Sequence, residues 1–153
     1  MDEAIIMAAE NNRKPQARNI SGEIEELRYV QQMYQNQYYI LTQQLEEVTV
    51  AYAETSRTKE AIDSMPKLKS KESMIPIGSG FYASGKLGDD KGILVPVGAS
   101  YTVKMDAPAA KALLDKRASR YTEQISKLSA AKKNTGNAIN EISYRLNELV
   151  QHI

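Results

Sequence analysis

The sequence predicts an α+β protein that is mainly α, in which a long antiparallel two-helix coiled coil is joined by two tandem β-hairpins. Three observations predict this fold class. A β-type pattern is duplicated near the middle of the chain, a long seven-residue apolar repeat precedes it, and a second such repeat follows it.

The duplicated pattern lies within residues 74–105. The segment Ile-Pro-Ile-Gly-Ser-Gly-Phe at 75–81 is echoed by Val-Pro-Val-Gly-Ala-Ser-Tyr at 95–101. Each copy alternates β-branched residues, opens a turn with Gly, and then starts a second extended run with an aromatic residue, as in a β-hairpin. The Gly- and Asp-rich segment 88–92 suits a reversing turn between the copies. Two tandem hairpins are therefore expected.

The first helix is expected over residues 20–65. Ser21 is its candidate N-cap, and Pro66 is expected to end it. The positions that form its apolar seam are Ile20, Ile24, Leu27, Gln31, Tyr34, Tyr38, Leu41, Leu45, Val48, Tyr52, Thr55, Lys59 and Ile62.

The second helix is expected over residues 106–153, with Asp106 as N-cap and Pro108 in the first turn, where its missing N–H costs nothing. Both helices should span roughly 45 residues, and equal lengths on either side of the hairpins favour an antiparallel pair. The seam positions of this helix are Leu114, Ala118, Tyr121, Ile125, Leu128, Lys132, Thr135, Ile139, Ile142, Leu146, Leu149 and Ile153.

A single domain over residues 20–153 is expected from the length of the chain. Residues 1–19 are polar after a short apolar run, contain Pro15 and show no sustained periodicity. They predict a flexible N-terminal arm.

Composition argues against several classes of function. The net charge of +1 disfavours nucleic acid or an anionic membrane as a partner, and the absence of Cys excludes disulfides and thiolate metal sites. The apolar run 4–9 lacks the basic flank and the length of a signal peptide or membrane span. We expect a cytoplasmic protein.

Motifs that resemble enzyme sites do not withstand inspection. Residues 80–86 match the spacing of a phosphate-binding loop, but Leu87 stands where Ser or Thr would hold Mg²⁺, and no helix follows. Residues 78–83 imitate a dinucleotide fingerprint but precede a strand. His152 is the one histidine and cannot build a multi-His metal site. We expect no enzyme and no catalytic, cofactor-binding or metal-binding residues.

Two sets of seam residues allow more than one interpretation. Thr55, Lys59, Lys132 and Thr135 interrupt the apolar repeat, and they favour control of register and local loosening of the coil over a specific binding role. The first helix also carries tyrosines that could stack on bases. Without a basic stripe beside them they favour packing on the seam and its flanks. These residues are Tyr29, Tyr34, Tyr38, Tyr39 and Tyr52.

The narrow seams bury little core within one chain, so the hairpins should be covered by other chains. Their alternating apolar residues form the expected subunit-assembly face. These residues are Ile75, Ile77, Phe81, Val95, Val97, Tyr101 and Val103.

A helix, a doubled Pro-Ile-Gly or Pro-Val-Gly hairpin unit and a second helix together resemble the alpha-type subunit of prefoldin, the ATP-independent co-chaperone of archaea and eukaryotes. The resemblance covers about residues 20–153 and is most specific in 75–81 and 95–98. It implies a heterohexamer of two alpha and four beta-type subunits, with hairpins joined into β-barrels and coiled coils projecting from them. It also implies that unfolded client proteins are held between the coiled-coil tips and delivered to a group II chaperonin. The alternative is a structural filament or scaffold subunit of the same fold.

The free end of the coiled coil is the expected client-binding site. In an antiparallel pair, the start of the first helix and the end of the second lie together, and coil ends open at little free-energy cost. The residues expected there are Ile20, Ile24, Leu27, Leu146, Leu149, Val150 and Ile153.

Overall fold

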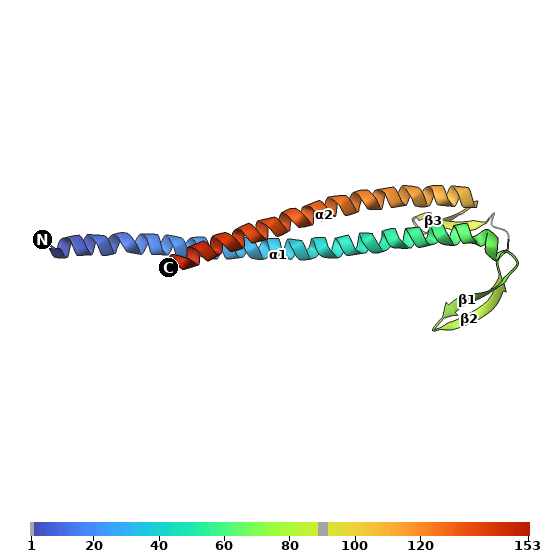
Figure 1. Cartoon of the computed structure of the whole chain (residues 1–153), viewed down its shortest axis with the longest axis horizontal. Coiled ribbons are helices and arrows are strands. Elements are labelled where there is room, and N and C mark those ends of the chain that lie inside the picture. Colours follow the sequence, from blue (N-terminus) through green and yellow to red (C-terminus); the bar gives the residue numbers. More distant parts are fainter. Residues whose placement is uncertain (1, 89–91) are drawn as a thin grey trace. The chain divides into compact units, whose positions relative to one another are not determined.

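The computed structural model describes residues 2–88 and 92–153, with side chains described from Asn19 onward. The chain forms two long helices and two antiparallel hairpins, so the predicted fold class is confirmed (Figure 1). The elements are α1 (Asp2–Leu68), β1 (Glu72–Gly78), β2 (Phe81–Lys86), β3 (Ile93–Gly98), β4 (Tyr101–Met105) and α2 (Ala107–Gln151). Residues 89–91 of the turn expected between the hairpins lie outside the described residues.

Helix α1 is longer than expected. It starts at Asp2 rather than near Ser21, so the backbone of the segment expected as a flexible arm is helical. Alanine, methionine, glutamate and arginine are frequent in this segment and are good helix formers, which outweighs the missing apolar periodicity. Helix α1 also continues past Pro66 to Leu68, because a proline in the last turn removes one hydrogen bond without preventing that turn. The two helices therefore differ in length, with 67 and 45 residues.

The chain divides into two units. The first unit combines Met1–Glu46 with Ser126–Ile153, and the second unit is Glu47–Ile125. Each contains a segment of both helices, and each is described separately below.

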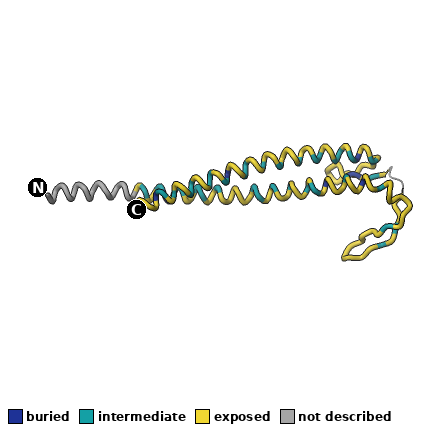
Figure 2. Tube along the Cα trace, in the orientation of Figure 1, coloured by how far each residue is buried: buried dark blue, intermediate teal, exposed yellow. Residues whose placement is uncertain are grey.

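In the first unit the helix segments run antiparallel. Arg145 Nη2 lies 3.3 Å from Glu23 Oε1, and Gln31 Nε2 donates a hydrogen bond of 2.8 Å to Ser143 Oγ. Later residues of α1 thus contact earlier residues of α2, as in an antiparallel pair. The expected seam positions of this unit are buried or half-buried, apart from Tyr38 and Ile153, which are exposed (Figure 2). The heptad assigned from the sequence is thus the contact face of both segments.

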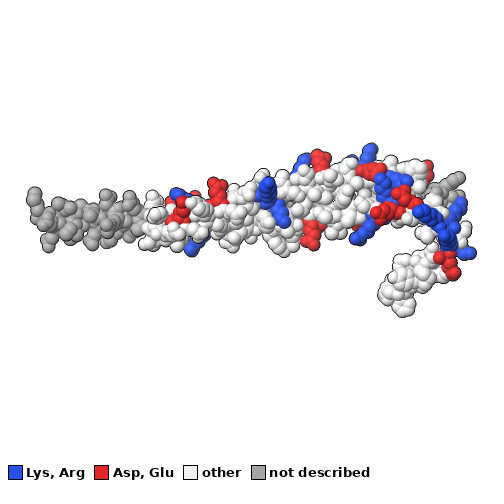
Figure 3. Space-filling model, in the orientation of Figure 1, with Lys and Arg blue, Asp and Glu red and all other residues white. Residues whose placement is uncertain are grey.

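The second unit repeats this arrangement and adds the hairpins. Lys59 Nζ lies 2.6 Å from Asp115 Oδ1, and Lys111 Nζ lies 2.6 Å from Asp63 Oδ1, again in antiparallel order. Charged side chains gather over this part of the helices (Figure 3). A small core of Ile62, Val95 and Ala110 joins both helices to β3.

Helix α2 begins as the sequence predicts. Asp106 precedes the first helical residue, and its Oδ1 accepts a hydrogen bond from the backbone N–H of Ala109 at 2.9 Å. Pro108 lies in the first turn, where no intrahelical partner is lost. Because one residue separates β4 from α2, the second hairpin is tied closely to this helix.

The two hairpins share one geometry. Ile75 pairs with Ala83 in the first hairpin, and Val95 pairs with Val103 in the second. Each register shifts after the proline, so Ile77 and Val97 lie in matching β-bulges. Both turns place two consecutive central residues at positive φ, as type I′ turns do. The duplication read in the sequence is therefore a duplication of structure.

Candidate functional site

The candidate assembly face is largely uncovered. Six of its seven residues are exposed: Ile75, Ile77, Phe81, Val97, Tyr101 and Val103. The bulge turns Ile77 and Val97 out of regular pairing, and the aromatic residues follow directly after the turns. Each hairpin thus presents β-branched and aromatic side chains to its surroundings, which is typical of a surface that another chain covers.

Val95 is the exception. Its side chain is 8% exposed and packs in the core with Ile62 and Ala110, whereas the matching Ile75 is 48% exposed. The expectation that only a neighbouring subunit could cover Val95 is therefore wrong. The chain's own helices cover it, because the short connection between β4 and α2 holds this hairpin against them.

Ile75 is partly covered by its own hairpin, and less completely than Val95 is covered by the helices. Its Cδ1 would lie 2.5 Å from a Cβ built on Gly85, so the isoleucine side chain lies across the bare backbone of that glycine. Gly85 therefore permits a close approach that a larger residue would obstruct. This contact covers part of Ile75 and leaves its remaining surface open.

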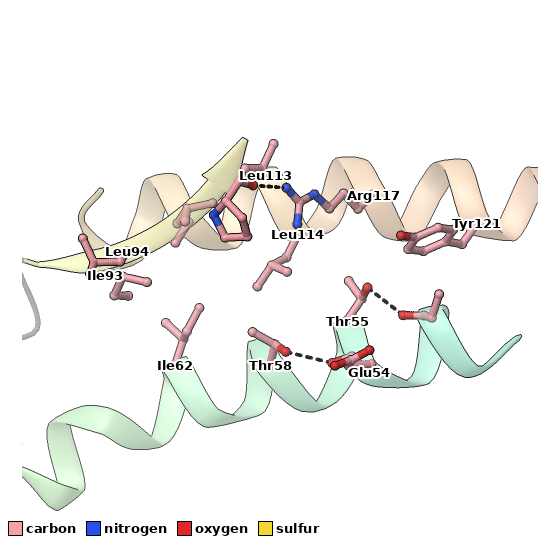
Figure 4. A pocket seen from close by; sticks show the side chains of 14 residues that line it. Glu54, Thr55, Thr58, Ile62, Ile93, Leu94, Leu113, Leu114, Arg117 and Tyr121 are labelled. Atoms are coloured by element: carbon pink, nitrogen blue, oxygen red, sulfur yellow. Dashed lines mark hydrogen bonds between the residues drawn. The ribbon is translucent and has the colours of Figure 1, made fainter. Parts of the chain in front are cut away.

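A cleft of about 340 Å³ lies between the second hairpin and the two helices of the second unit (Figure 4). Ile62, Leu114 and Val95 contribute apolar lining, while Thr55 and Tyr121 add polar groups. Above it, Arg117 Nη2 donates a hydrogen bond of 2.6 Å to the backbone O of Pro96. The cleft thus lies where the second hairpin packs on the helices, and the hydrogen bond of Arg117 links α2 to β3 beside it.

The sequence alone gave no sign of the role of Arg117. The residue lies beside the seam of α2, a position where a charged side chain is ordinary, so no local pattern marked it. Its role depends on the Pro96 carbonyl, which the fold brings close from 21 positions away.

The residues expected at the client-binding end all lie in the first unit. Ile24 and Leu149 are buried in the seam, while Ile20, Leu27 and Leu146 are half-buried. Val150 and Ile153 are exposed, at 51% and 83%. The structure therefore brings five of the seven residues into the last layers of the coil and leaves two on its surface.

The polar seam residues make specific contacts. The hydroxyls of Thr55 and Thr135 are buried and each donates to a carbonyl one turn earlier, at 2.9 Å, so neither needs a partner across the seam. Lys132 Nζ lies 5.2 Å from the centroid of the Tyr38 ring, within the range of a cation–π contact. This ring also packs on Gly136 of α2. The contact between Lys132 and Tyr38 crosses the seam and so favours one register, whereas the two threonine hydroxyls bond within their own helices.

Two ion pairs between the helices of the second unit shift the pKa values of Lys59 and Asp63. The hydrogen bond and charge of Asp115 raise the pKa of Lys59 above its ordinary value. The hydrogen bond from Lys111 lowers the pKa of Asp63 below its ordinary value. Both groups stay charged at neutral pH, so they act as cross-helix contacts rather than as an acid and a base poised for catalysis.

The segment that matches the phosphate-loop spacing forms strand β2 and does not open a helix. Lys86 is exposed at the end of β2, and His152 is exposed just beyond α2. Among the described residues, no group of three or more His, Asp or Glu side chains lies close enough together to hold a metal ion. Neither helix contains, over its described residues, a stretch apolar and long enough to cross a membrane.

Comparison with known proteins agrees with this geometry. The family described as "Prefoldin subunit" matches residues 34–152, which cover about half of α1, both hairpins and all of α2. The chain belongs to the prefoldin family. It is an alpha-type prefoldin subunit, in agreement with its doubled hairpin and with relatives of that name.

Two of these relatives are archaeal prefoldin subunits. The chain is 32% identical to prefoldin subunit alpha of Pyrococcus horikoshii, over 84% of this chain and 88% of the relative. It is 34% identical to prefoldin subunit alpha 1 of Thermococcus kodakarensis, over 64% of this chain and 68% of the relative. Prefoldin is a chaperone family rather than an enzyme family, so a role in protein folding follows.

A solved structure shares the fold. It is a cryo-EM structure of filamentous PFD from Methanocaldococcus jannaschii, with a TM-score of 0.52 and 18% sequence identity, covering 80% of this chain and 96% of that one. Membership of the prefoldin family supports assembly of the chain with other prefoldin subunits, and this neighbour shows the shared fold.

Proposed function

We propose that this prefoldin subunit is an ATP-independent holdase of the cytoplasm, which binds non-native polypeptides where α2 ends beside residues 20–27 of α1 and delivers them to a group II chaperonin. The observation that carries the proposal is the pair of exposed apolar residues, Val150 and Ile153, at the end of α2. They adjoin seam layers in which Ile20, Leu27 and Leu146 are only half-buried.

Weak contacts suffice for such a function. A few apolar side chains at one helix end bind an extended apolar segment with low affinity and release it readily. Several helix ends around one client raise the overall affinity through effective concentration, without nucleotide hydrolysis. The required number of ends comes from assembly, which we assign to the open hairpin faces.

The proposed particle contains two alpha and four beta-type subunits whose hairpins join into β-barrels. Two short exposed hairpins in one chain leave open strand edges and apolar faces, and such hairpins gain stability when neighbouring strands cover them. The exposed Ile77 and Val97 lie at matching bulges and would enter equivalent contacts in both hairpins.

A filament or scaffold subunit is the second candidate. It is favoured by the likeness to the filamentous PFD structure, together with the same open strand edges. A closed particle formed with a single-hairpin beta-type subunit supports the chaperone, whereas open-ended growth of the chain alone supports the filament.

Truncation of the helix ends tests the client site. A chain that lacks residues 1–26 and 146–153 loses the proposed site but keeps both hairpins and most of each seam. Assembled with a beta-type subunit, it should keep the mass expected of its particle and no longer suppress aggregation of chemically denatured citrate synthase. Replacing the exposed Val50, which lies in the second unit and outside the proposed site, with Ser provides a control that should protect normally. Full protection by the truncated particle would contradict the proposed site.

A further inference from the structure

A second exposed apolar surface lies on α1, starting two residues after Leu27 of the proposed client site. Tyr29, Met33, Tyr39 and Ile40 are 67%, 55%, 63% and 54% exposed. We call these four residues the outer face of α1. In the heptad they occupy positions that point away from the seam with α2, so the chain's own second helix leaves them open.

The outer face carries no charge. No Lys, Arg, Asp or Glu occurs between Arg28 and Glu46, where the polar residues are mainly Gln. The corresponding surface of α2 in the same unit carries Lys127, Lys133 and Glu141. A solvated helix face is ordinarily charged, as on α2, so the uncharged stretch of α1 is not explained by contact with water.

Two hydrogen bonds fix side chains at the outer face of α1 or next to it. Gln31 Nε2 donates to Ser143 Oγ at 2.8 Å in the seam beneath the outer face. Gln43 Nε2 donates to the hydroxyl of Tyr39 at 2.7 Å, which orients this ring along the helix surface. Tyr and Met together combine large contact area with adaptability, which suits a surface that accepts varied apolar partners.

The size and charge of the outer face restrict its occupant. From Tyr29 to Ile40 the helix rises about 17 Å, the length of about five residues of extended chain. A partner helix in a stable coiled coil needs a repeat of about three heptads or more, so this face is too short for a second copy of α1. A charged segment would lose hydration here without gaining a counter-charge, whereas an uncharged apolar segment would not.

We propose that the outer face of α1 binds short, extended, uncharged apolar segments of non-native polypeptides as a second contact surface beside the helix end. The inference rests on the proposed holdase function and extends it, because it specifies the class of segment and a separate place of contact. A client held at the end would then also lie along the side of the coil, and the two weak contacts would act together.

The test uses the full-length chain assembled with a beta-type subunit and two fluorescein-labelled peptides. One peptide contains only Leu, Phe, Ser and Gly, and the other replaces every third residue with Glu. In the variant M33Q/I40Q, which removes apolar surface without adding charge, affinity for the uncharged peptide should fall about fivefold by fluorescence anisotropy. In M33K/I40K it should fall further, while affinity for the Glu-containing peptide rises.

A matched control places the same two charges on α2. Asn137 and Asn140 are exposed in the same unit, so N137K/N140K should bind the uncharged peptide as the unmodified chain does. A photo-crosslinking residue at Tyr39 should capture the uncharged peptide, and one at the exposed Asn137 of α2 should not.

Four outcomes would overturn the inference. Unchanged affinity in M33Q/I40Q with no crosslink at Tyr39 would remove the outer face as a client surface. A fall in particle mass in M33Q/I40Q would make it a subunit interface instead. An unmodified particle that binds neither peptide would contradict the proposed function as well. Binding that is lost on deletion of residues 146–153 but unchanged in M33Q/I40Q would reject the outer face alone.

Discussion

The two hairpins have nearly the same sequence pattern, the same register and the same bulge, yet they differ in what covers them. Val95 of the second hairpin is buried against Ile62 and Ala110, while Ile75 of the first is half exposed. A duplicated pattern therefore specifies a duplicated local structure but not a duplicated environment. The connection to α2 decides the difference, because one residue joins β4 to that helix.

The difference in burial between the two hairpins separates two roles, stability of the single chain and contact with other subunits, which the sequence pattern alone does not distinguish. The buried side of the second hairpin contributes to the stability of the single chain. The exposed residues of both hairpins are left for contacts with other subunits. Substitutions at matched positions of the two hairpins should thus have different consequences.

Aspartate at the two matched positions provides the sharpest contrast. Val95→Asp should destabilise the second unit by about 3 kcal/mol, because it places a charge in an apolar core. Ile75→Asp should change the stability of the isolated chain by no more than about 0.5 kcal/mol, because its side chain is half exposed. Urea unfolding followed by circular dichroism measures both values. Equal losses in the two variants would show that the hairpins are covered alike.

Arg117 provides a second distinction between the hairpins. Replacing it with Ala removes the hydrogen bond to the Pro96 carbonyl and should cost about 1 kcal/mol, since the contact is charged but exposed. Amide hydrogen exchange should become faster in β3 and β4 and stay unchanged in β1 and β2. The variant R120A, three residues further along α2, is the control. Faster exchange in both hairpins would mean that Arg117 acts on the unit as a whole.

Gly80 and Ser100 occupy the same position in the turns of the two hairpins, so each residue can be replaced by the other. Gly80 has a φ of +78° and Ser100 has a φ of +64°, and glycine adopts such angles without the strain of a side chain. Ser100→Gly should stabilise the second hairpin by about 0.5 kcal/mol, after the entropic cost of glycine is subtracted, and Gly80→Ser should destabilise the first by a similar amount. Thermal unfolding of the two variants measures the effects. The same sign for both would contradict this account of the turns.

The ion pair of Asp63 with Lys111 should have the smallest effect. Hydrogen bonding lowers the folded-state pKa of Asp63, so its contribution is complete above the unfolded pKa and is lost as the pH falls through the lower, folded value. The melting temperature should therefore decrease slightly on acidification below about pH 4, and this part of the decrease should be absent in D63N. Because the pair is exposed, salt should weaken it as well. A pH profile unchanged by D63N would show that the pair contributes nothing.

Much of the architecture could be predicted from the sequence, because each element carries its own periodicity. The heptads identified most of the buried positions of both helices, although they left out Ala110, which is 2% exposed, and the Gly-led turns identified the hairpins. The start of α1 could not be predicted in this way, since residues 2–19 are helical without a periodic apolar face. The burial of Val95 and the role of Arg117 also escaped prediction, because both depend on contacts between segments far apart in the chain.

The candidate sites were predictable to different degrees. Six of the seven residues expected on the assembly face are exposed, since alternation alone defines a strand face, and their role in assembly stays a prediction. The outer face of α1 was visible only as scattered tyrosines, and its significance came from their exposure and from the absence of nearby charge. The client site at the helix end stays a prediction.

Assembly through the hairpins is the central claim, and one measurement addresses it directly. The variant I77D/V97D places a charge at the exposed bulge of each hairpin and leaves both helix seams intact. Mixed with a beta-type prefoldin subunit and weighed by light scattering, the unmodified chain should form a closed particle. The variant should keep its helical circular dichroism but give only the masses of separate chains. A particle of undiminished mass from the variant would contradict the assignment of the hairpins as the assembly surface.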